Sequence, residues 1–273
     1  MDLIKIKSNA KINLGLEIVG KRNNGYHNLR SIFQEIDLAD EITIKKTDTH
    51  SIKLTCSNPD LPTDNRNTAY RAAEFLLDRI SGVDIHIEKK IPHEAGLGGG
   101  SSNAAATLLG INQLFKLNMD DTELMKFAEL IGSDVTFFIF GKQALVSGVG
   151  NILKAIHFPF NYPIVLLKPD VSFSTREIYQ NYQKFLGKHK EIDFDSFFRN
   201  PVAESYHLLR NDLEKAVSKP IITYLKKYLS SQGAFYSAMT GSGSVVYGLF
   251  QKKPDLHDLP DDVNVFFSRG ITD

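Results

Sequence analysis

The segment from Ile91 to Ala106, IPHEAGLGGGSSNAAA, constrains this chain more than any other stretch. Four glycines within five positions are followed by two serines and then by strong helix formers. Because glycine lacks a Cβ, backbone N–H groups can approach an anion closely there, and a following helix start adds unpaired N–H donors. The pattern predicts a loop-to-helix phosphate cradle, with Ser101 or Ser102 as the helix N-cap. Its residues are Gly96, Leu97, Gly98, Gly99, Gly100, Ser101 and Ser102.

This glycine segment matches neither of the two familiar nucleotide-binding fingerprints. The P-loop is excluded because no Lys-Ser or Lys-Thr pair follows the glycines, and the dinucleotide fingerprint fits poorly because Ser101 stands where its third glycine belongs. The alternative interpretation is a flexible turn that merely caps a buried helix.

Composition narrows the class of protein. The 273 residues allow one large domain or two packed lobes, and we expect a boundary near residue 155, between 1–155 and 156–273. Lys plus Arg and Asp plus Glu both number 32, so no basic excess suggests a nucleic-acid partner. The single cysteine excludes an internal disulfide, and no Cys/His cluster has zinc spacing. The start of the chain lacks a signal-like apolar region, and no apolar run is long enough to span a membrane, so we expect a cytoplasmic protein.

Periodicity predicts an α+β fold, because several strands precede and separate helices without strict alternation. The first strand carries apolar residues at 12, 14, 16 and 18, which point one way, while Lys11, Asn13, Gly15 and Glu17 point the other. Further strands are expected at 41–45, 51–56, 83–89, 164–167 and 245–250, and helices at 67–80, capped by Asn67, and at 121–131.

Two charged residues stand out as candidates for chemistry. Lys11 lies beside Asn13 on the polar face of the first strand, where a solvated surface lysine is the alternative. Asp134 precedes the very apolar 135–140 stretch, where partial desolvation would tune an acid–base group. A helix-cap or turn aspartate is the alternative for Asp134.

Two turns are further candidates. Gly25-Tyr26-His27 presents an aromatic ring and an imidazole that could stack on or hydrogen-bond a flat heterocycle, although surface packing is the alternative. The second small-residue turn, Thr240 to Ser244 with Gly241, Ser242 and Gly243, could approach phosphate or another backbone, or simply close a hairpin.

In their order and spacing, these segments together resemble the GHMP small-molecule kinase superfamily. The segments are Ala10–Leu14, Gly25-Tyr26-His27, Gly96–Ser102, Gly132–Val135 and Thr240–Gly243. The glycine segment alone indicates only the superfamily. Gly-Tyr-His and Lys-x-Asn narrow the resemblance to the kinases that phosphorylate cytidine diphosphate-linked methylerythritol in the non-mevalonate isoprenoid route. The resemblance spans almost the whole chain.

The resemblance implies a two-lobed α+β fold, with an N-terminal lobe like domain 2 of ribosomal protein S5 and a ferredoxin-like C-terminal α/β sandwich. It implies ATP and Mg²⁺ as cofactors, a small-molecule substrate, and a monomer or weak homodimer. Lys11 and Asp134 correspond to the catalytic pair: Asp134 takes or orients the hydroxyl proton, while Lys11 keeps that carboxylate ionised and neutralises developing charge. Gly96–Ser102 would cradle the ATP phosphates, with Ser102 the nearest candidate for Mg²⁺.

The same resemblance assigns the substrate contacts. His27 would hydrogen-bond the cytosine and Tyr179 would stack on it, with Tyr26, Asn13 and Thr175 at the same site. Asn67 would lie near adenine, with Asn65 as an alternative after a small shift.

One residue departs from the family pattern. Glu94 stands where many relatives carry glycine, and a carboxylate near triphosphate would be repulsive, so we expect its side chain to point away. The rival interpretations are a GHMP kinase acting on mevalonate or homoserine, and a non-catalytic nucleotide-binding regulator.

Overall fold

The computed structural model describes residues 2–188, 190–259 and 261–272, which divide into two compact units. Unit 1 comprises the described residues of Met1–Ala10, Ala39–Ile91 and Gly98–Gly141; unit 2 comprises those of Lys11–Leu38, Pro92–Leu97 and Lys142–Asp273. Two long paired strands, β1 (Leu3–Lys21) and β2 (His27–Lys46), contribute to both units. The division therefore differs from a single boundary near residue 155, because the chain passes between the units several times.

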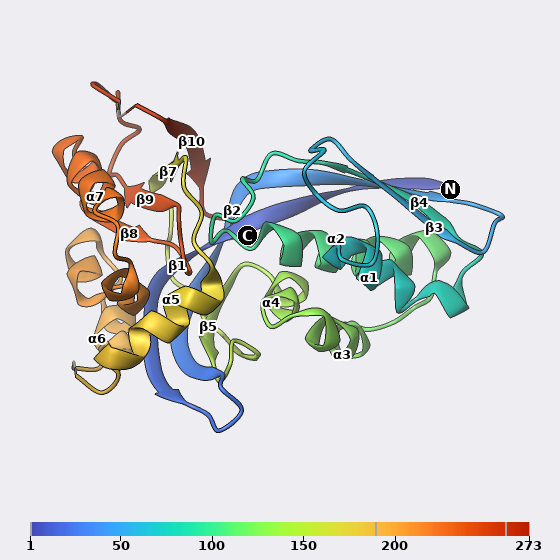
Figure 1. The fold of residues 1–273 in the computed structure, drawn as a ribbon, viewed down its shortest axis with the longest axis horizontal. Helices are drawn as coiled ribbons and strands as arrows, with labels where there is room; N and C mark the ends of the chain where they lie inside the picture. Colours follow the sequence, from blue (N-terminus) through green and yellow to red (C-terminus); the bar gives the residue numbers. More distant parts are fainter. Residues whose placement is uncertain (1, 189, 260, 273) are drawn as a thin grey trace. The chain divides into compact units, whose positions relative to one another are not determined.

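Unit 1 packs helices against one face of a sheet (Figure 1). Strand β2 pairs antiparallel with β4, and β4 pairs parallel with β3. Helix α2 packs on this sheet so closely that a Cβ at Gly110 would lie 2.6 Å from the side chain of Ile44. The elements are β3 (Ile52–Cys56), α1 (Thr68–Glu74), β4 (Val83–Glu88), α2 (Gly99–Phe115), α3 (Asp121–Ile131) and α4 (Val135–Phe140).

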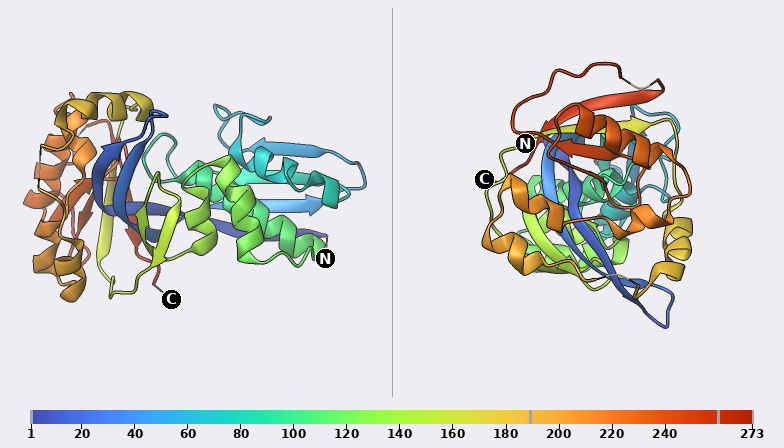
Figure 2. Two further views of the ribbon diagram at one scale, coloured as in Figure 1. Left: turned by 90° about the horizontal axis from the view of Figure 1, so that it is seen from below. Right: turned by 90° about the vertical axis from the view of Figure 1, so that its left-hand side faces the viewer.

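Unit 2 contains an antiparallel four-stranded sheet in the order β10-β7-β9-β8, with α7 packed on β8 and β9 (Figure 2). The first part of β2 also pairs with β5, and β5 pairs with β6. The elements are β5 (Gln143–Ser147), β6 (Ile152–Ala155), β7 (Pro163–Pro169), α5 (Thr175–Tyr182), α6 (Phe194–Arg199), α7 (Ile221–Ser231), β8 (Tyr236–Met239), β9 (Val246–Leu249) and β10 (Val263–Arg269).

Most predicted elements are confirmed. Helix α3 has the predicted bounds, and Asn67 caps α1 by accepting from the N–H of Ala69 at 2.9 Å. The helix predicted over 67–80 is shorter, because after Glu74 the chain tightens into i→i+3 hydrogen bonds such as that from Leu76 N to Ala73 O. A 3₁₀ turn over Leu77–Arg79 then ends it.

The polar face of the first strand is buried, which removes the alternative of a solvated surface Lys11. Lys11, Asn13 and Glu17, on the polar face, are each at most 3% exposed. Alternation reports that the two faces differ in polarity, but side chains from other segments of unit 2 cover the polar face. Among the described residues, no helix is long and apolar enough to cross a membrane.

Candidate active site

Helix α2 begins directly in the glycine segment. Its N-cap is Gly98, in the left-handed conformation at φ 72°, and no side chain caps it. The prediction of Ser101 or Ser102 as N-cap is therefore wrong. The glycine turns the chain into the helix, and Ser102 already donates its N–H to the carbonyl of Gly98 at 2.9 Å.

The N-cap Gly98 has no side chain to accept from the first N–H groups of α2, so these groups can donate to an anion. Gly99, Gly100 and Ser101 form the first turn, where two residues lack a Cβ and the helix dipole favours negative charge. Ser102 is only 2% exposed, and its Oγ accepts from the hydroxyl of Ser8 at 2.7 Å. This end of α2 is suited to bind phosphate.

Lys11, on β1 in unit 2, is buried rather than solvated. Its Nζ donates to Oδ1 of Asn13 at 2.7 Å and lies 4.6 Å from the ring centroid of Phe33. Its backbone N–H donates to the carbonyl of Leu97 at 3.0 Å, which ties the strand to the glycine segment. A buried ammonium needs polar partners and is seldom retained without a function.

Asn13 is held by several segments of unit 2 and is 1% exposed. Its Nδ2 donates to Oγ of Ser31 at 2.9 Å, and its backbone carbonyl accepts from the hydroxyl of Tyr247 at 2.8 Å. Its backbone N–H and its Oδ1 both contact Oγ1 of Thr240, each at 3.2 Å. Asn13 thereby fixes the side chain of Lys11, and its predicted contact with substrate stays a prediction.

The second small-residue turn meets the glycine segment. Thr240 Oγ1 donates to the carbonyl of Gly96 at 3.2 Å, and Gly241 lies against the same residue. Ser242 Oγ and Thr175 Oγ1 are 2.8 Å apart, which joins the turn to the start of α5. Gly243, at φ 86°, completes the turn. The alternative that this turn only closes a hairpin is excluded.

His27 and Tyr179, to which the resemblance assigns the cytosine, lie together in unit 2. Their ring centroids are 5.3 Å apart at an interplanar angle of 40°. His27 is 7% exposed, and its Nε2 has no hydrogen-bond partner among the described residues. Burial, and secondarily the charge of Lys21, lower the pKa of His27, so the ring is neutral at pH 7. Tyr26 is 65% exposed, and its place at this site stays a prediction.

Asp134 and Asn67 lie in unit 1. Asp134 occupies the position before α4, but its side chain makes no capping hydrogen bond, which removes the helix-cap alternative. The amide of Asn67, by contrast, is committed to structure: Oδ1 caps α1, and Nδ2 donates to the carbonyl of Pro62 at 2.8 Å. The adenine-side role of Asn67 stays a prediction.

Glu94 adopts the left-handed conformation at φ 51°, which explains why glycine suits this position. Its side chain is 56% exposed and lies 3.7 Å from Nε2 of His93. The carboxylate also acts on Lys168, where burial lowers the pKa while the charges of Asp170 and Glu94 oppose that effect. The exposed side chain agrees with the expectation that it points away from phosphate.

We expect Glu94→Gly to raise the free energy of unfolding by about 1 kcal/mol, because glycine removes the left-handed strain. Chemical denaturation measures the change. The matched control is His93→Gly, at a neighbour without a positive φ, where added chain entropy lowers stability instead. Equal losses in both variants would show that Glu94 is unstrained.

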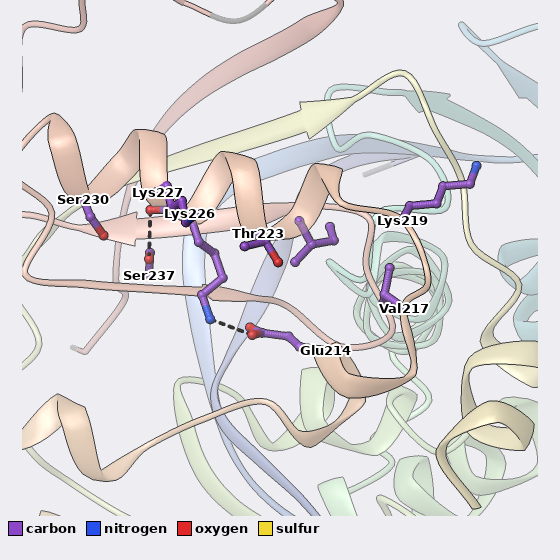
Figure 3. A pocket seen from close by; sticks show the side chains of 9 residues that line it. Glu214, Val217, Lys219, Thr223, Lys226, Lys227, Ser230 and Ser237 are labelled. Carbon is purple, nitrogen blue, oxygen red and sulfur yellow. Dashed lines mark hydrogen bonds and ion pairs between the residues drawn. The ribbon is translucent and has the colours of Figure 1, made fainter. Parts of the chain in front are cut away.

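A separate hollow of about 370 Å³ borders α7 (Figure 3). Both carboxylate oxygens of Glu214, which lines it, already accept hydrogen bonds from the protein. Oε2 accepts from Lys226 Nζ at 2.6 Å, and Oε1 accepts from the N–H of Met239 at 2.8 Å. No residue of the predicted site lines it. The lining residues are Glu214, Val217, Lys219, Ile222, Thr223, Lys226, Lys227, Ser230 and Ser237.

Several residues that support the site carry no local sequence signal. Asp40, Lys89 and Ser8 of unit 1 form a buried polar network with Asn103 at the start of α2. No local pattern marks these residues, because only the fold brings them together. Among the described residues, no group of three or more His, Cys, Asp or Glu could hold a metal ion.

Comparisons with known proteins identify the family of this chain. The family model described as the GHMP kinases N terminal domain matches residues 67–142, and that described as GHMP kinases C terminal matches 197–267. The chain therefore belongs to the GHMP kinases, and it is an ATP-dependent small-molecule kinase.

Individual relatives show to which group within the GHMP kinases this chain is similar. The 4-diphosphocytidyl-2-C-methyl-D-erythritol kinase of Geobacter sulfurreducens is 42% identical over 93% of this chain and 92% of its own length. That of Geotalea daltonii is 40% identical over 93% and 91%. A crystal structure of 4-(cytidine 5'-diphospho)-2C-methyl-D-erythritol kinase superposes with a TM-score of 0.80 at 28% identity, covering 98% of this chain and 99% of that one. Within the GHMP kinases, these relatives place the chain in the 4-diphosphocytidyl-2-C-methyl-D-erythritol kinase family.

Proposed function

We propose that this kinase transfers the γ-phosphoryl group of ATP to the 2-hydroxyl of 4-diphosphocytidyl-2-C-methyl-D-erythritol. The observation that carries the proposal is the buried Nε2 of His27, unpartnered among the described residues, beside the ring of Tyr179. A buried polar atom without a partner is unfavourable unless a ligand satisfies it. A neutral imidazole can donate from one nitrogen and accept at the other, which suits the edge of cytosine.

In this proposal the ATP phosphates bind at the start of α2, over Gly96–Ser102. Phosphoryl transfer depends mainly on positioning and on stabilising charge. Mg²⁺, when bound, neutralises the phosphates, and we assign the hydroxyl of Ser102 as the protein group nearest to it. The immobile hydroxyl, held by Ser8, suits a fixed contact.

The two charged residues act on the transfer itself. Asp134 accepts or orients the proton of the substrate hydroxyl, the role that the family resemblance implies for this carboxylate. Lys11 neutralises charge that develops during transfer, and Asn13 and Phe33 keep its ammonium in one place.

One assay tests the substrate: ADP release with the cytidine substrate, mevalonate or homoserine. We expect release with the cytidine substrate alone. Release only with mevalonate or homoserine would assign the chain to one of those kinases, whose substrates offer no ring to stack on. ATP binding without release on any substrate would support the non-catalytic regulator.

His27→Ala is expected to raise the KM for the cytidine substrate about 10- to 100-fold, because it removes a buried hydrogen-bonding ring. The KM for ATP should change less than twofold. Because its lowered pKa keeps His27 neutral, the wild-type substrate KM should stay flat between about pH 6.5 and 8 and rise only at lower pH. Exposed His50 provides the control in His50→Ala. Equal effects on both KM values would remove His27 from the base pocket.

A further inference from the structure

A buried carboxylate lies at the centre of the polar network of unit 1. Asp40, on β2, is 1% exposed. Its Oδ1 accepts from the backbone N–H groups of Lys90 and Ile91 at 2.7 and 2.8 Å. Its Oδ2 accepts from Nζ of Lys89 and from Nδ2 of Asn103, the latter at 2.8 Å. Four donors therefore converge on one carboxylate, which fixes its orientation.

This network reaches the first turns of α2 by two routes. Through the ion pair, Lys89 Nζ also donates to Oδ1 of Asn103 at 3.3 Å. Through the amide, Asn103 Nδ2 donates to Oγ of Ser8 at 2.8 Å, and Ser8 donates to Oγ of Ser102 at 2.7 Å. The orientation of the Ser102 hydroxyl thus depends, two hydrogen bonds away, on the amide that Asp40 holds.

The ammonium of Lys89 sits where positive charge is unfavourable unless a negative charge lies nearby. A Cβ at Gly99, the first residue of α2, would lie 3.4 Å from Lys89 Nζ. An ammonium beside the positive end of a helix is repelled by it, and a buried charge needs a partner. Asp40 supplies that partner from β2. The ammonium of Lys89 and the positive end of the helix dipole then remain together at the start of α2. Both would attract a bound anion.

We infer that Asp40 is a positioning residue for the ATP phosphates, acting through Lys89, Asn103 and Ser8 without touching the nucleotide. The inference rests on the proposed binding of phosphate at the start of α2, and it is independent of which alcohol is phosphorylated. The function of Asp40 is to hold the ammonium of Lys89, the amide of Asn103 and the hydroxyl of Ser8 in one arrangement before ATP binds. Such preorganisation lowers the ordering cost of binding.

The test measures the dissociation constant of a non-hydrolysable ATP analogue by calorimetry. Asp40→Asn should weaken binding of the analogue about 10-fold or more, while the KM for the alcohol substrate changes less than twofold. The control is Asp212→Asn in unit 2, where an equally buried carboxylate pairs with Arg210 at 2.8 Å. We expect that control to lower stability and leave affinity for the analogue within twofold.

Ser8→Ala leaves the Asp40–Lys89 ion pair in place and removes the two hydrogen bonds of the Ser8 hydroxyl, the one accepted from Asn103 Nδ2 and the one donated to Ser102 Oγ. It should weaken binding of the analogue about three- to tenfold, which keeps the inference testable if Asp40→Asn does not fold. Unchanged affinity in Ser8→Ala together with unchanged affinity or no folding in Asp40→Asn would overturn it. So would equal losses for the analogue and the alcohol, which indicate a purely structural role. Failure of the substrate proposal would appear separately, as a lack of turnover with an intact affinity for the analogue.

Discussion

Asp134→Asn is expected to lower kcat about 10²- to 10⁴-fold while ATP still binds. Asparagine keeps the size of the side chain but cannot accept the proton of the attacking hydroxyl. The loss should therefore fall on turnover rather than on folding. ADP release measures turnover, and calorimetry with ATP measures binding.

Asp120→Asn is the matched control for that substitution. Asp120 caps α3 by accepting from the N–H of Glu123 at 2.9 Å, and asparagine caps helices equally well. Its activity and stability should match wild type. Undiminished turnover in Asp134→Asn would remove Asp134 from the chemistry. A loss of folding in Asp134→Asn would instead give it a structural role.

The second large effect is expected for Gly96→Ala. Gly96 has φ +75°, and a Cβ there would lie 2.1 Å from the carbonyl oxygen of Thr240. That oxygen belongs to the backbone of the second small-residue turn, so it cannot rotate away. The free energy of unfolding should fall by about 3 kcal/mol or more. The affinity for ATP should fall with it, because the phosphate-binding segment Gly96–Ser102 must move away from Thr240. Chemical denaturation and calorimetry measure the two losses.

Gly187→Ala separates backbone strain from the clash. Gly187 has φ +69°, close to that of Gly96, but a Cβ there meets nothing within 4 Å. Its loss should be about 1 kcal/mol, the strain of a left-handed alanine alone. The difference between the two variants measures the contact between Gly96 and Thr240. Similar losses in both would show that the two turns do not depend on each other.

Local sequence patterns predicted most of the fold because they reflect interactions between residues that are near one another in the sequence. The capped, amphipathic segment of α3 has its predicted bounds, and the short apolar run at 164–167 lies within β7. Local patterns failed where the environment of a residue depends on the rest of the fold. Alternation could not show that the polar face of β1 is covered, and two serines after the glycines could not reveal that Gly98 begins α2.

The sequence by itself determined the family, and through that resemblance it supplied the residues to which we assign the chemistry: a glycine segment before a helix, Lys11, Asp134 and the pair formed by His27 and Tyr179. These signals can be recognised in the sequence alone because each is a short run or a distinctive residue type. Only the tertiary structure decided the environment of those groups. Thr240 reaches Asn13 across 227 positions, and Lys89 reaches Asp40 across 49. Burial and hydrogen bonding are properties of the folded neighbourhood, so no local pattern encodes them.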